Sequence, residues 1–275
     1  MINTHSIINV NDLVFEDFTT SSKSILMRDF LRKIHSLAKI DVNVVLVGEI
    51  GSGKKQLAKV IHDNSKRSKE SFYPFYCVDI DETEYQSAFW GKLTYEEQHL
   101  VLKYEALENA INGTLFLDQF SELSPKMMES IVESYIKGCN QLFRYNSTSK
   151  PRLVLSINQE TYQDIINTSL WKKLLDKLSP VVIMIPPLRE RKEDIPSLIA
   201  SFLEVIKSNN KAFGDLDISV QALSKCMDYS WPGNMRQLKN AIVQGAILSY
   251  GKTIECEHLP FTMNWRLPYE VNTGS

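Results

Sequence analysis

Apolar residues along the first two thirds of the chain alternate between helical spacing and short continuous runs. Between Ser24 and Lys39 they recur every three or four residues, which predicts an amphipathic helix, and a similar helix follows residue 54. Between such segments lie short apolar runs that predict buried strands. The predicted strands are 42–47, 72–80, 115–117, 152–156 and 181–185, and further helices are predicted at 100–111 and 124–138. This alternation predicts a mainly parallel sheet covered by helices on both faces.

The strand pattern ends at Pro186 and Pro187. Helical spacing then continues through 194–207, 219–229 and 234–250. The 275 residues are enough for one α/β body and a small satellite. The predicted organisation is an N-terminal arm at 1–21, an α/β subdomain at 22–187, a helical subdomain at 188–262 and a tail at 263–275.

Composition excludes several classes of protein. The net charge of −2 gives no broad basic field that would gather nucleic acid. The four cysteines form no CxxC pair and the five histidines have no zinc-site spacing, so we expect no structural metal. No apolar run approaches the roughly 20 residues of a membrane helix, and the start lacks the features of a signal peptide. We expect a cytoplasmic protein without membrane contact.

Residues 48–54, GEIGSGK, match the phosphate-loop pattern G-x-x-x-x-G-K between a predicted strand and a predicted helix. The glycines let backbone N–H groups turn toward phosphate oxygens, the helix N-terminus adds its dipole, and Lys54 adds a charge. The alternative is a glycine turn that binds nothing. Lys55 stands where a Ser or Thr usually contacts Mg²⁺. The predicted nucleotide-binding residues here are Gly48, Glu49, Ile50, Gly51, Ser52, Gly53, Lys54 and Lys55. Basic residues 54–69 could also touch a phosphate backbone, but a solvated helix face is the simpler interpretation.

Four stretches in order carry a family resemblance: GEIGSGKK at 48–55, NGTLFLDQF at 112–120, PPLRERKEDIP at 186–196 and WPGNMRQLKN at 231–240. Together they resemble the AAA+ domain of the sigma-54-dependent transcription activators over roughly residues 22–262. The resemblance implies an α/β P-loop AAA+ fold, a three-layer parallel sheet with a C-terminal helical lid subdomain. In that family the AAA+ ring hydrolyses ATP and remodels sigma-54 RNA polymerase.

The resemblance assigns roles to four positions. It places the Walker B aspartate, which can hold Mg²⁺, at Asp118. The family's next residue is a Glu that acts as base, but here it is Gln119, and loss of a positioned base typically costs ~10²–10⁴ in rate. Sensor I corresponds to Asn158. Sensor II corresponds to Arg236, a further nucleotide-binding candidate in the first turn of a helix with Asn234 as the expected N-cap.

Other family features are replaced. The two arginine-finger positions hold Trp171 and Lys177, and a finger can contribute ~10³–10⁵ in rate. Trp171 would either stack in a subunit interface or pack inside the chain. The sigma-54 contact loop, GAFTGA in the family, is absent from the interval between Gly91 and Asn112, where a helix-favouring run is expected instead. Fifteen residues after Pro260 are too few for the helix-turn-helix that family members usually carry.

These departures predict a degenerate family member. It would bind ATP or ADP, with Mg²⁺, hydrolyse little or none, and contact a protein of transcription control, such as an intact AAA+ activator or RNA polymerase. It could form homo- or hetero-oligomers, and we do not expect it to bind DNA on its own. One alternative is a slow ATPase that activates transcription. The other is a non-catalytic scaffold or anti-activator whose pocket is vestigial or binds another nucleotide, such as a cyclic dinucleotide.

Overall fold

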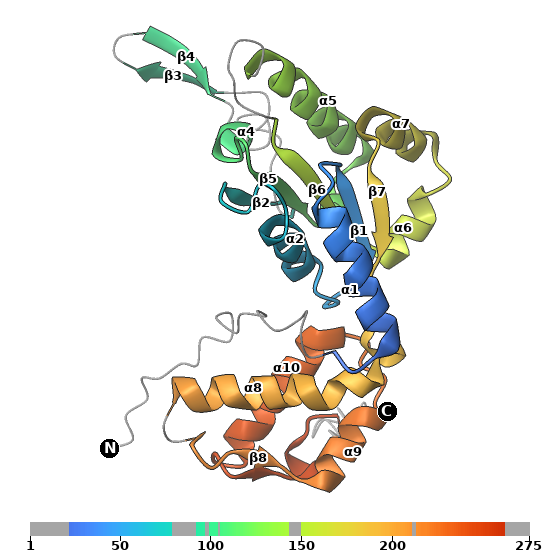
Figure 1. Cartoon of the computed structure of the whole chain (residues 1–275), viewed down its shortest axis with the longest axis vertical. Coiled ribbons are helices and arrows are strands. Elements are labelled where there is room, and N and C mark those ends of the chain that lie inside the picture. The colour runs from blue at the N-terminus through green and yellow to red at the C-terminus, as the bar shows by residue number, and fades with distance from the viewer. Residues whose placement is uncertain are drawn as a thin grey trace, which may run out of the picture. The chain divides into compact units, whose positions relative to one another are not determined.

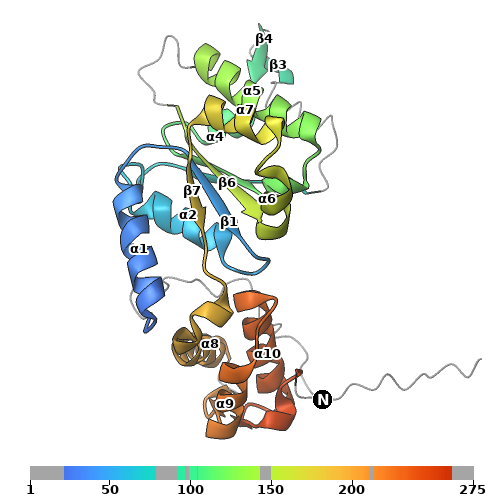
Figure 2. The same cartoon turned by 90° about the vertical axis from the view of Figure 1, so that its right-hand side faces the viewer.

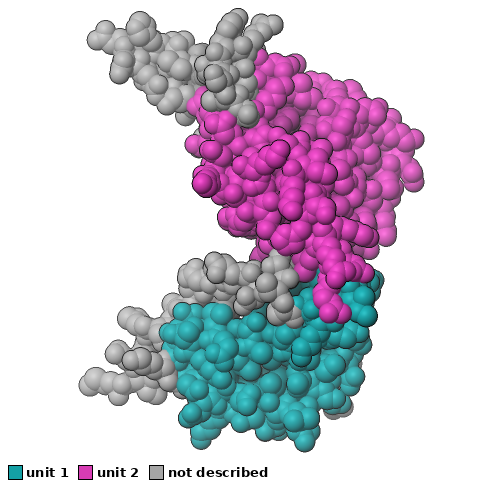
Figure 3. All heavy atoms as spheres, in the orientation of Figure 1, with its two compact units in different colours: residues 1–27, 188–275 teal, residues 28–187 magenta. Residues whose placement is uncertain are grey.

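The computed structural model describes residues 22–78, 92–96, 99–103, 105–142, 150–210 and 213–261. The chain divides into two compact units, residues 28–187 and residues 1–27 with 188–275, coloured separately in Figure 3. We call them the body and the lid unit. The predicted arm at 1–21 and tail at 263–275 lie outside the described residues.

The body is built on the predicted parallel sheet (Figure 1). Its five strands lie in the order β2-β5-β6-β1-β7, and all four neighbouring pairs are parallel. The strands are β1 (Val44–Gly48), β2 (Phe72–Tyr76), β5 (Thr114–Asp118), β6 (Arg152–Asn158) and β7 (Val181–Met184). The prediction that the last strand is buried is wrong at its ends, because β7 lies at the sheet edge and both Val181 and Met184 are exposed.

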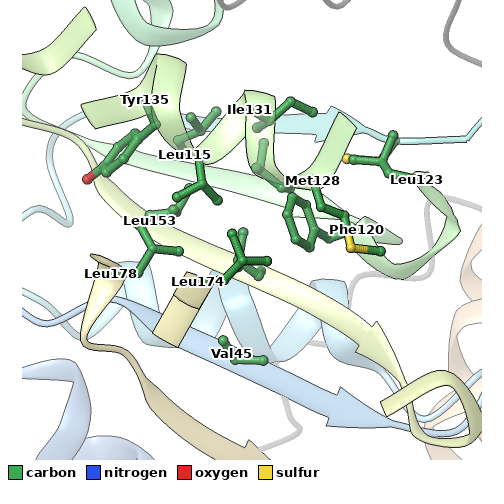
Figure 4. Close-up of a cluster of buried hydrophobic side chains, with 14 of the residues drawn as sticks. Val45, Leu115, Phe120, Leu123, Met128, Ile131, Tyr135, Leu153, Leu174 and Leu178 are labelled. Carbon is green, nitrogen blue, oxygen red and sulfur yellow. The ribbon is translucent and has the colours of Figure 1, made fainter. Parts of the chain in front are cut away.

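Helices cover both faces of the sheet, as predicted (Figure 2). Alternate residues of β1 face opposite ways: Val45 and Val47 join the cluster with α5 and α7, whereas Val44 and Leu46 join the cluster with α1 and α2. Figure 4 shows the first cluster. The helices are α1 (Ile25–Ala38), α2 (Lys54–Asp63), α4 (Glu105–Asn109), α5 (Pro125–Leu142), α6 (Gln159–Ile165) and α7 (Ser169–Leu178).

The prediction of one helix over 100–111 is wrong. Strands β3 (Lys92–Glu96) and β4 (His99–Lys103) form a separate antiparallel hairpin, and only α4 is helical. The hairpin also takes the place of the helix-favouring run expected between Gly91 and Asn112. The reason is visible in the sequence, because KLTYE alternates polar and apolar residues and HLVLK contains a short apolar run. Both patterns fit strands, and they outweigh the helix propensity of the neighbouring Glu and Gln residues.

The lid unit contains the three predicted helices, α8 (Ile195–Asn209), α9 (Val220–Asp228) and α10 (Asn234–Leu248). Two short parallel strands that were not predicted, β8 (Asp217–Ile218) and β9 (Thr253–Ile254), join them. The buried Asp194 carboxylate accepts hydrogen bonds from the N–H groups of Lys23 and Ser24 at 2.8 and 2.9 Å, which fixes the segment before α1. Within the described ranges, no helix has the length and apolar character needed to cross a membrane.

Candidate functional site

The loop between β1 and α2 has a backbone that requires its glycines. Gly51 and Gly53 have φ angles of 74° and 96°, in the left-handed region that other residues enter at a cost. A Cβ on Gly48 would lie 2.7 Å from Ser52 Oγ. The sequence GEIGSGK therefore forms the tight strand-to-helix turn that the phosphate-loop pattern predicts.

Two side chains of this loop are turned inward. Lys54 Nζ donates to the carbonyl oxygens of Gly48 and Glu49 at 2.7 and 3.0 Å. The Ser52 hydroxyl is buried and has no hydrogen-bond partner among the described residues. A buried hydroxyl without a partner is unusual in a folded protein, and a polar group that entered the loop would be able to satisfy it.

Lys55 lies on the outer side of α2. Its Nζ hydrogen-bonds to the Tyr76 hydroxyl and lies 5.0 Å from the centroid of that ring. Tyr76 ends β2 and is in register with Asp118 of β5. The Lys55 amine is therefore engaged at the edge of the sheet in this structure.

The other cations of the basic segment 54–69 serve the fold where their contacts are described. Lys59 pairs with Asp63 one turn along α2. Arg67 pairs with Asp41 at 2.6 Å and also donates to the Asn112 carbonyl at 2.7 Å. These contacts favour the solvated helix face over a phosphate-backbone surface.

Asp118, at the end of β5, is held by a residue that the sequence analysis did not single out. Ser156 Oγ donates to Asp118 Oδ1 at 2.6 Å, and the N–H of Gln119 lies 3.0 Å from the same oxygen and 2.8 Å from Ser156 Oγ. The second oxygen, Oδ2, receives no hydrogen bond from the described residues. The signal for Ser156 was its hydroxyl within the otherwise apolar run LVLSI.

The predicted site residues of the body meet at the carboxyl edge of the sheet. Asn158 ends β6 and is in register with Gly48, and its N–H donates to Ser121 Oγ at 3.2 Å. Asp118, at the end of the neighbouring strand β5, is hydrogen-bonded to Ser156 of β6. Ser156 lies two residues before Asn158. Gln119 follows with an exposed side chain and a φ of 57°. The parallel register thus brings Gly48, Asp118 and Asn158 to one edge, as neighbouring parallel strands require.

Trp171 packs inside the body. Its side chain is 1% exposed, belongs to the cluster between the sheet and α5, and meets Tyr162 edge-to-face at 5.8 Å between ring centroids. Its indole Nε1 has no hydrogen-bond partner among the described residues. Of the two predicted roles for Trp171, internal packing matches the structure.

Lys177 is paired within its own chain. Its Nζ donates to Glu133 Oε1 of α5 at 2.8 Å, and Lys173 pairs in the same way with Glu129. The hydrogen bond from Lys177 holds the pKa of the Glu133 carboxyl below its usual value. Both positions that the resemblance assigns to arginine fingers therefore hold side chains engaged with α5 or with the core that α5 covers.

Arg236, in the lid unit, lies in the first turn of α10 as predicted, and its side chain is exposed. The prediction that Asn234 caps this helix is wrong. Asn234 is buried, has a φ of 51°, and its Oδ1 accepts the N–H of Leu188 at 2.8 Å. Gly233 occupies the N-cap position instead, and its N–H donates to Gln237 Oε1 at 2.9 Å.

Comparison with known families decides the origin of this arrangement. The family model described as the sigma-54 interaction domain matches residues 20–184, and the AAA+ ATPase lid domain model matches residues 189–272. The chain belongs to the sigma-54 interaction domain family. The predicted resemblance and the predicted AAA+ fold with a lid are confirmed.

Relatives of this sigma-54 interaction domain protein are regulators of transcription. It is 32% identical over 230 residues to the Nif-specific regulatory protein of Bradyrhizobium diazoefficiens, covering 82% of this chain and 39% of the relative. It is 33% identical over 235 residues to the Nif-specific regulatory protein of Azotobacter vinelandii (83% and 44%). It is 28% identical over 274 residues to the transcriptional regulatory protein ZraR of Escherichia coli (96% and 60%). The chain therefore spans less than two thirds of the length of these relatives.

Solved structures give the same fold. The crystal structure of NtrX from Brucella abortus in complex with ATP matches with a TM-score of 0.72 at 26% identity, covering 87% of this chain and 56% of NtrX. The complex of NtrX with ADP matches with a TM-score of 0.71. The roles of individual residues in this sigma-54 interaction domain stay predictions.

Proposed function

We propose that this protein binds ATP or ADP at loop 48–54, hydrolyses little or none of it, and regulates transcription through contacts with other proteins. Membership of a family whose relatives are transcription regulators supports the regulatory part. The structures of NtrX with ATP and with ADP support the nucleotide part, because NtrX shares the fold.

The donor set of the loop suits a nucleotide polyphosphate. Gly51 and Gly53 open the turn, Lys54 supplies an ammonium, and the Ser52 hydroxyl is buried and unsatisfied within the described chain. On binding, Lys54 would exchange the carbonyl oxygens of Gly48 and Glu49 for phosphate oxygens. A charged hydrogen bond of this kind is stronger than one between neutral groups.

Asp118 can offer Mg²⁺ one carboxylate oxygen. Its oxygen Oδ1 is occupied by Ser156 and the Gln119 N–H, which leaves Oδ2 for a metal or a metal-bound water. Mg²⁺ commonly takes only one or two carboxylates and completes its shell with phosphates and water. Bound there, Mg²⁺ would neutralise phosphate charge. Lys55, at the position of the usual hydroxyl ligand, has its amine at Tyr76.

The observation that carries the loss of hydrolysis is Gln119, an amide directly after an intact Asp118. An amide can orient a water but cannot accept its proton, so the base step is missing. Two further observations act in the same direction. Trp171 is buried in the core, and the Lys177 amine is paired to Glu133 of its own chain.

A regulator that does not hydrolyse its nucleotide would act through its contacts with other proteins. Bound nucleotide stabilises the folded state or an assembly by linkage, without turnover. We propose that the partner is a protein of transcription control, either an intact AAA+ activator or RNA polymerase. We also propose that the chain acts within a homo- or hetero-oligomer.

Lys54→Ala is expected to weaken nucleotide binding by roughly 10- to 100-fold, because a hydrogen bond to a charged group contributes about 1.5–3 kcal/mol. Fluorescence anisotropy of a labelled ATP analogue, titrated with the purified chain, measures the dissociation constant. Lys59→Ala is the matched control, since Lys59 lies on the same helix and pairs with Asp63. It should bind like the parent.

Three results would count against the proposal. If the parent does not bind at millimolar nucleotide and Lys54→Ala behaves identically, the loop is vestigial. A parallel thermal-shift screen that finds stabilisation only by a cyclic dinucleotide would favour the scaffold alternative. Turnover in the parent that disappears in Asp118→Ala would identify a slow ATPase.

A further inference from the structure

The β3–β4 hairpin is a small sheet apart from the main one (Figure 1). Among the described residues, β3 pairs only with β4. The outer edge of β3 therefore has no strand beside it within that part of the chain. A two-stranded hairpin alone is marginally stable in water, and additional strands stabilise it.

The register gives this hairpin two different faces. Leu93 is opposite Leu102, and Tyr95 is opposite Leu100, so these four apolar positions share one face. The other face carries the pairs Lys92–Lys103, Thr94–Val101 and Glu96–His99. An antiparallel sheet with one apolar face gains most from widening, since each added strand extends that face.

The sequence of β3, KLTYE, is complementary to a second copy of itself in the antiparallel direction. When two copies are aligned with Thr94 at the centre, Lys92 of one copy is opposite Glu96 of the other. Leu93 is then opposite Tyr95 of the second copy, and Thr94 is opposite Thr94. Opposite charges, aromatic–aliphatic pairs and Thr–Thr pairs are all favourable cross-strand neighbours.

Strand β4 lacks this property. HLVLK aligned antiparallel with itself places His99 opposite Lys103, which gives no charge attraction. Proteins usually protect free strand edges with charges that repel a second chain. Here the charges at the two ends of β3 have opposite signs, so they attract a second copy in one register.

We propose that β3 pairs antiparallel with β3 of a second copy of this chain, about a two-fold axis at Thr94, to form a four-stranded sheet β4-β3-β3-β4. The interface is isologous, because each copy contributes the same strand. The two-fold repeats every pair, so Lys92 meets Glu96 of the second copy twice. The apolar positions of both hairpins then lie on one continuous face.

Charge exchange tests the register. Sedimentation equilibrium of the full chain without nucleotide should show the parent in concentration-dependent exchange between monomer and dimer. Lys92→Glu and Glu96→Lys should each weaken the dimer by about tenfold or more, because each creates two like-charge pairs across the axis. The double variant Lys92→Glu/Glu96→Lys should restore the parent's dimer, since the opposite charges are paired again.

The Lys92→Glu variant separates pairing from folding. Within one hairpin it places Glu opposite Lys103, which favours β3–β4 pairing, so a weaker dimer cannot come from a less stable hairpin. As a second measurement, Thr94→Cys should give a disulfide-linked dimer under mild oxidation with oxidised glutathione. Directly opposite residues of antiparallel strands have Cα atoms about 4.5–5.5 Å apart, within the range of a disulfide.

A monomeric parent at every concentration would overturn the proposal. So would equal association in all four proteins, or two weakened single variants without recovery in the double variant. Nucleotide is absent throughout, so each of these results leaves the proposed nucleotide binding untouched.

Discussion

Trp171→Arg is expected to unfold the body or destabilise it by more than about 4 kcal/mol. Trp171 is 1% exposed between the sheet and α5, and truncating a buried Trp alone costs about 3–5 kcal/mol. The substitution also buries a guanidinium with no carboxylate placed to receive it, which adds to the loss. Chemical denaturation followed by far-UV circular dichroism measures the change in the free energy of unfolding.

Two other substitutions provide controls for this prediction. Trp171→Phe keeps an aromatic ring near Tyr162 and should cost about 1–2 kcal/mol. Lys177→Arg should stay within about 0.5 kcal/mol of the parent, because Lys177 is an exposed residue and an arginine there can still pair with Glu133. A Trp171→Arg variant as stable as the parent would contradict the packing described for α7 and would show that this position can present an arginine at the surface.

This prediction bears on the proposed loss of ATP hydrolysis. At position 171 the side chain is part of the core, so we expect that a single substitution to arginine cannot supply a finger there. Position 177 differs, since a cation remains and is paired with Glu133. The two positions that the resemblance assigns to arginine fingers therefore differ in how readily they would accept an arginine.

Gly113→Ala is expected to cost about 3 kcal/mol or more. A Cβ at Gly113 would lie 1.9 Å from the Ser71 carbonyl oxygen, and that oxygen accepts the N–H of Thr114 at 2.8 Å. The clash is with backbone, so the start of β5 would have to separate from the residue before β2 and lose this hydrogen bond. The midpoint of urea unfolding should fall accordingly.

Gly214→Ala is the matched control for this change. Gly214 is exposed in a turn of the lid unit, is not among the residues with positive φ, and should change stability by less than about 0.5 kcal/mol. A Gly113→Ala protein with the parent's unfolding midpoint would show that β2 and β5 do not approach each other at this point as described.

One structural rule decides where three parts of the predicted site lie. The carboxyl ends of neighbouring parallel strands meet at one edge, so GEIGSGK, Asp118 and Asn158 had to converge there. Ser156 was missed because it stands within a run that otherwise indicates a core strand. Its partner, Asp118, is 38 residues away and belongs to another strand. Contacts of this kind follow from register rather than from local pattern.

The failures have different causes. Residues 100–103 form a short apolar run that fits a helix or a strand, and pairing with 92–96 favours the strand. Asn234 is a residue type that is favoured at N-caps, yet its side-chain oxygen accepts a hydrogen bond from the N–H of Leu188, 46 residues away. Helices α6 and α7 were not predicted, because this segment was compared only with the family's arginine-finger motif. The N-cap Thr168, whose side chain accepts the N–H of Trp171, was an available signal for α7.

Single-turnover hydrolysis tests the central claim most directly. An excess of protein is mixed with trace labelled ATP and Mg²⁺, quenched at intervals from seconds to hours, and analysed for bound ATP and ADP. We predict that ATP binds and stays intact, and that Gln119→Glu alone does not change this, because Trp171 and Lys177 still occupy the finger positions. Conversion of bound ATP to ADP within minutes in the parent, absent in Asp118→Ala, would contradict the proposal, as would rapid turnover in Gln119→Glu alone.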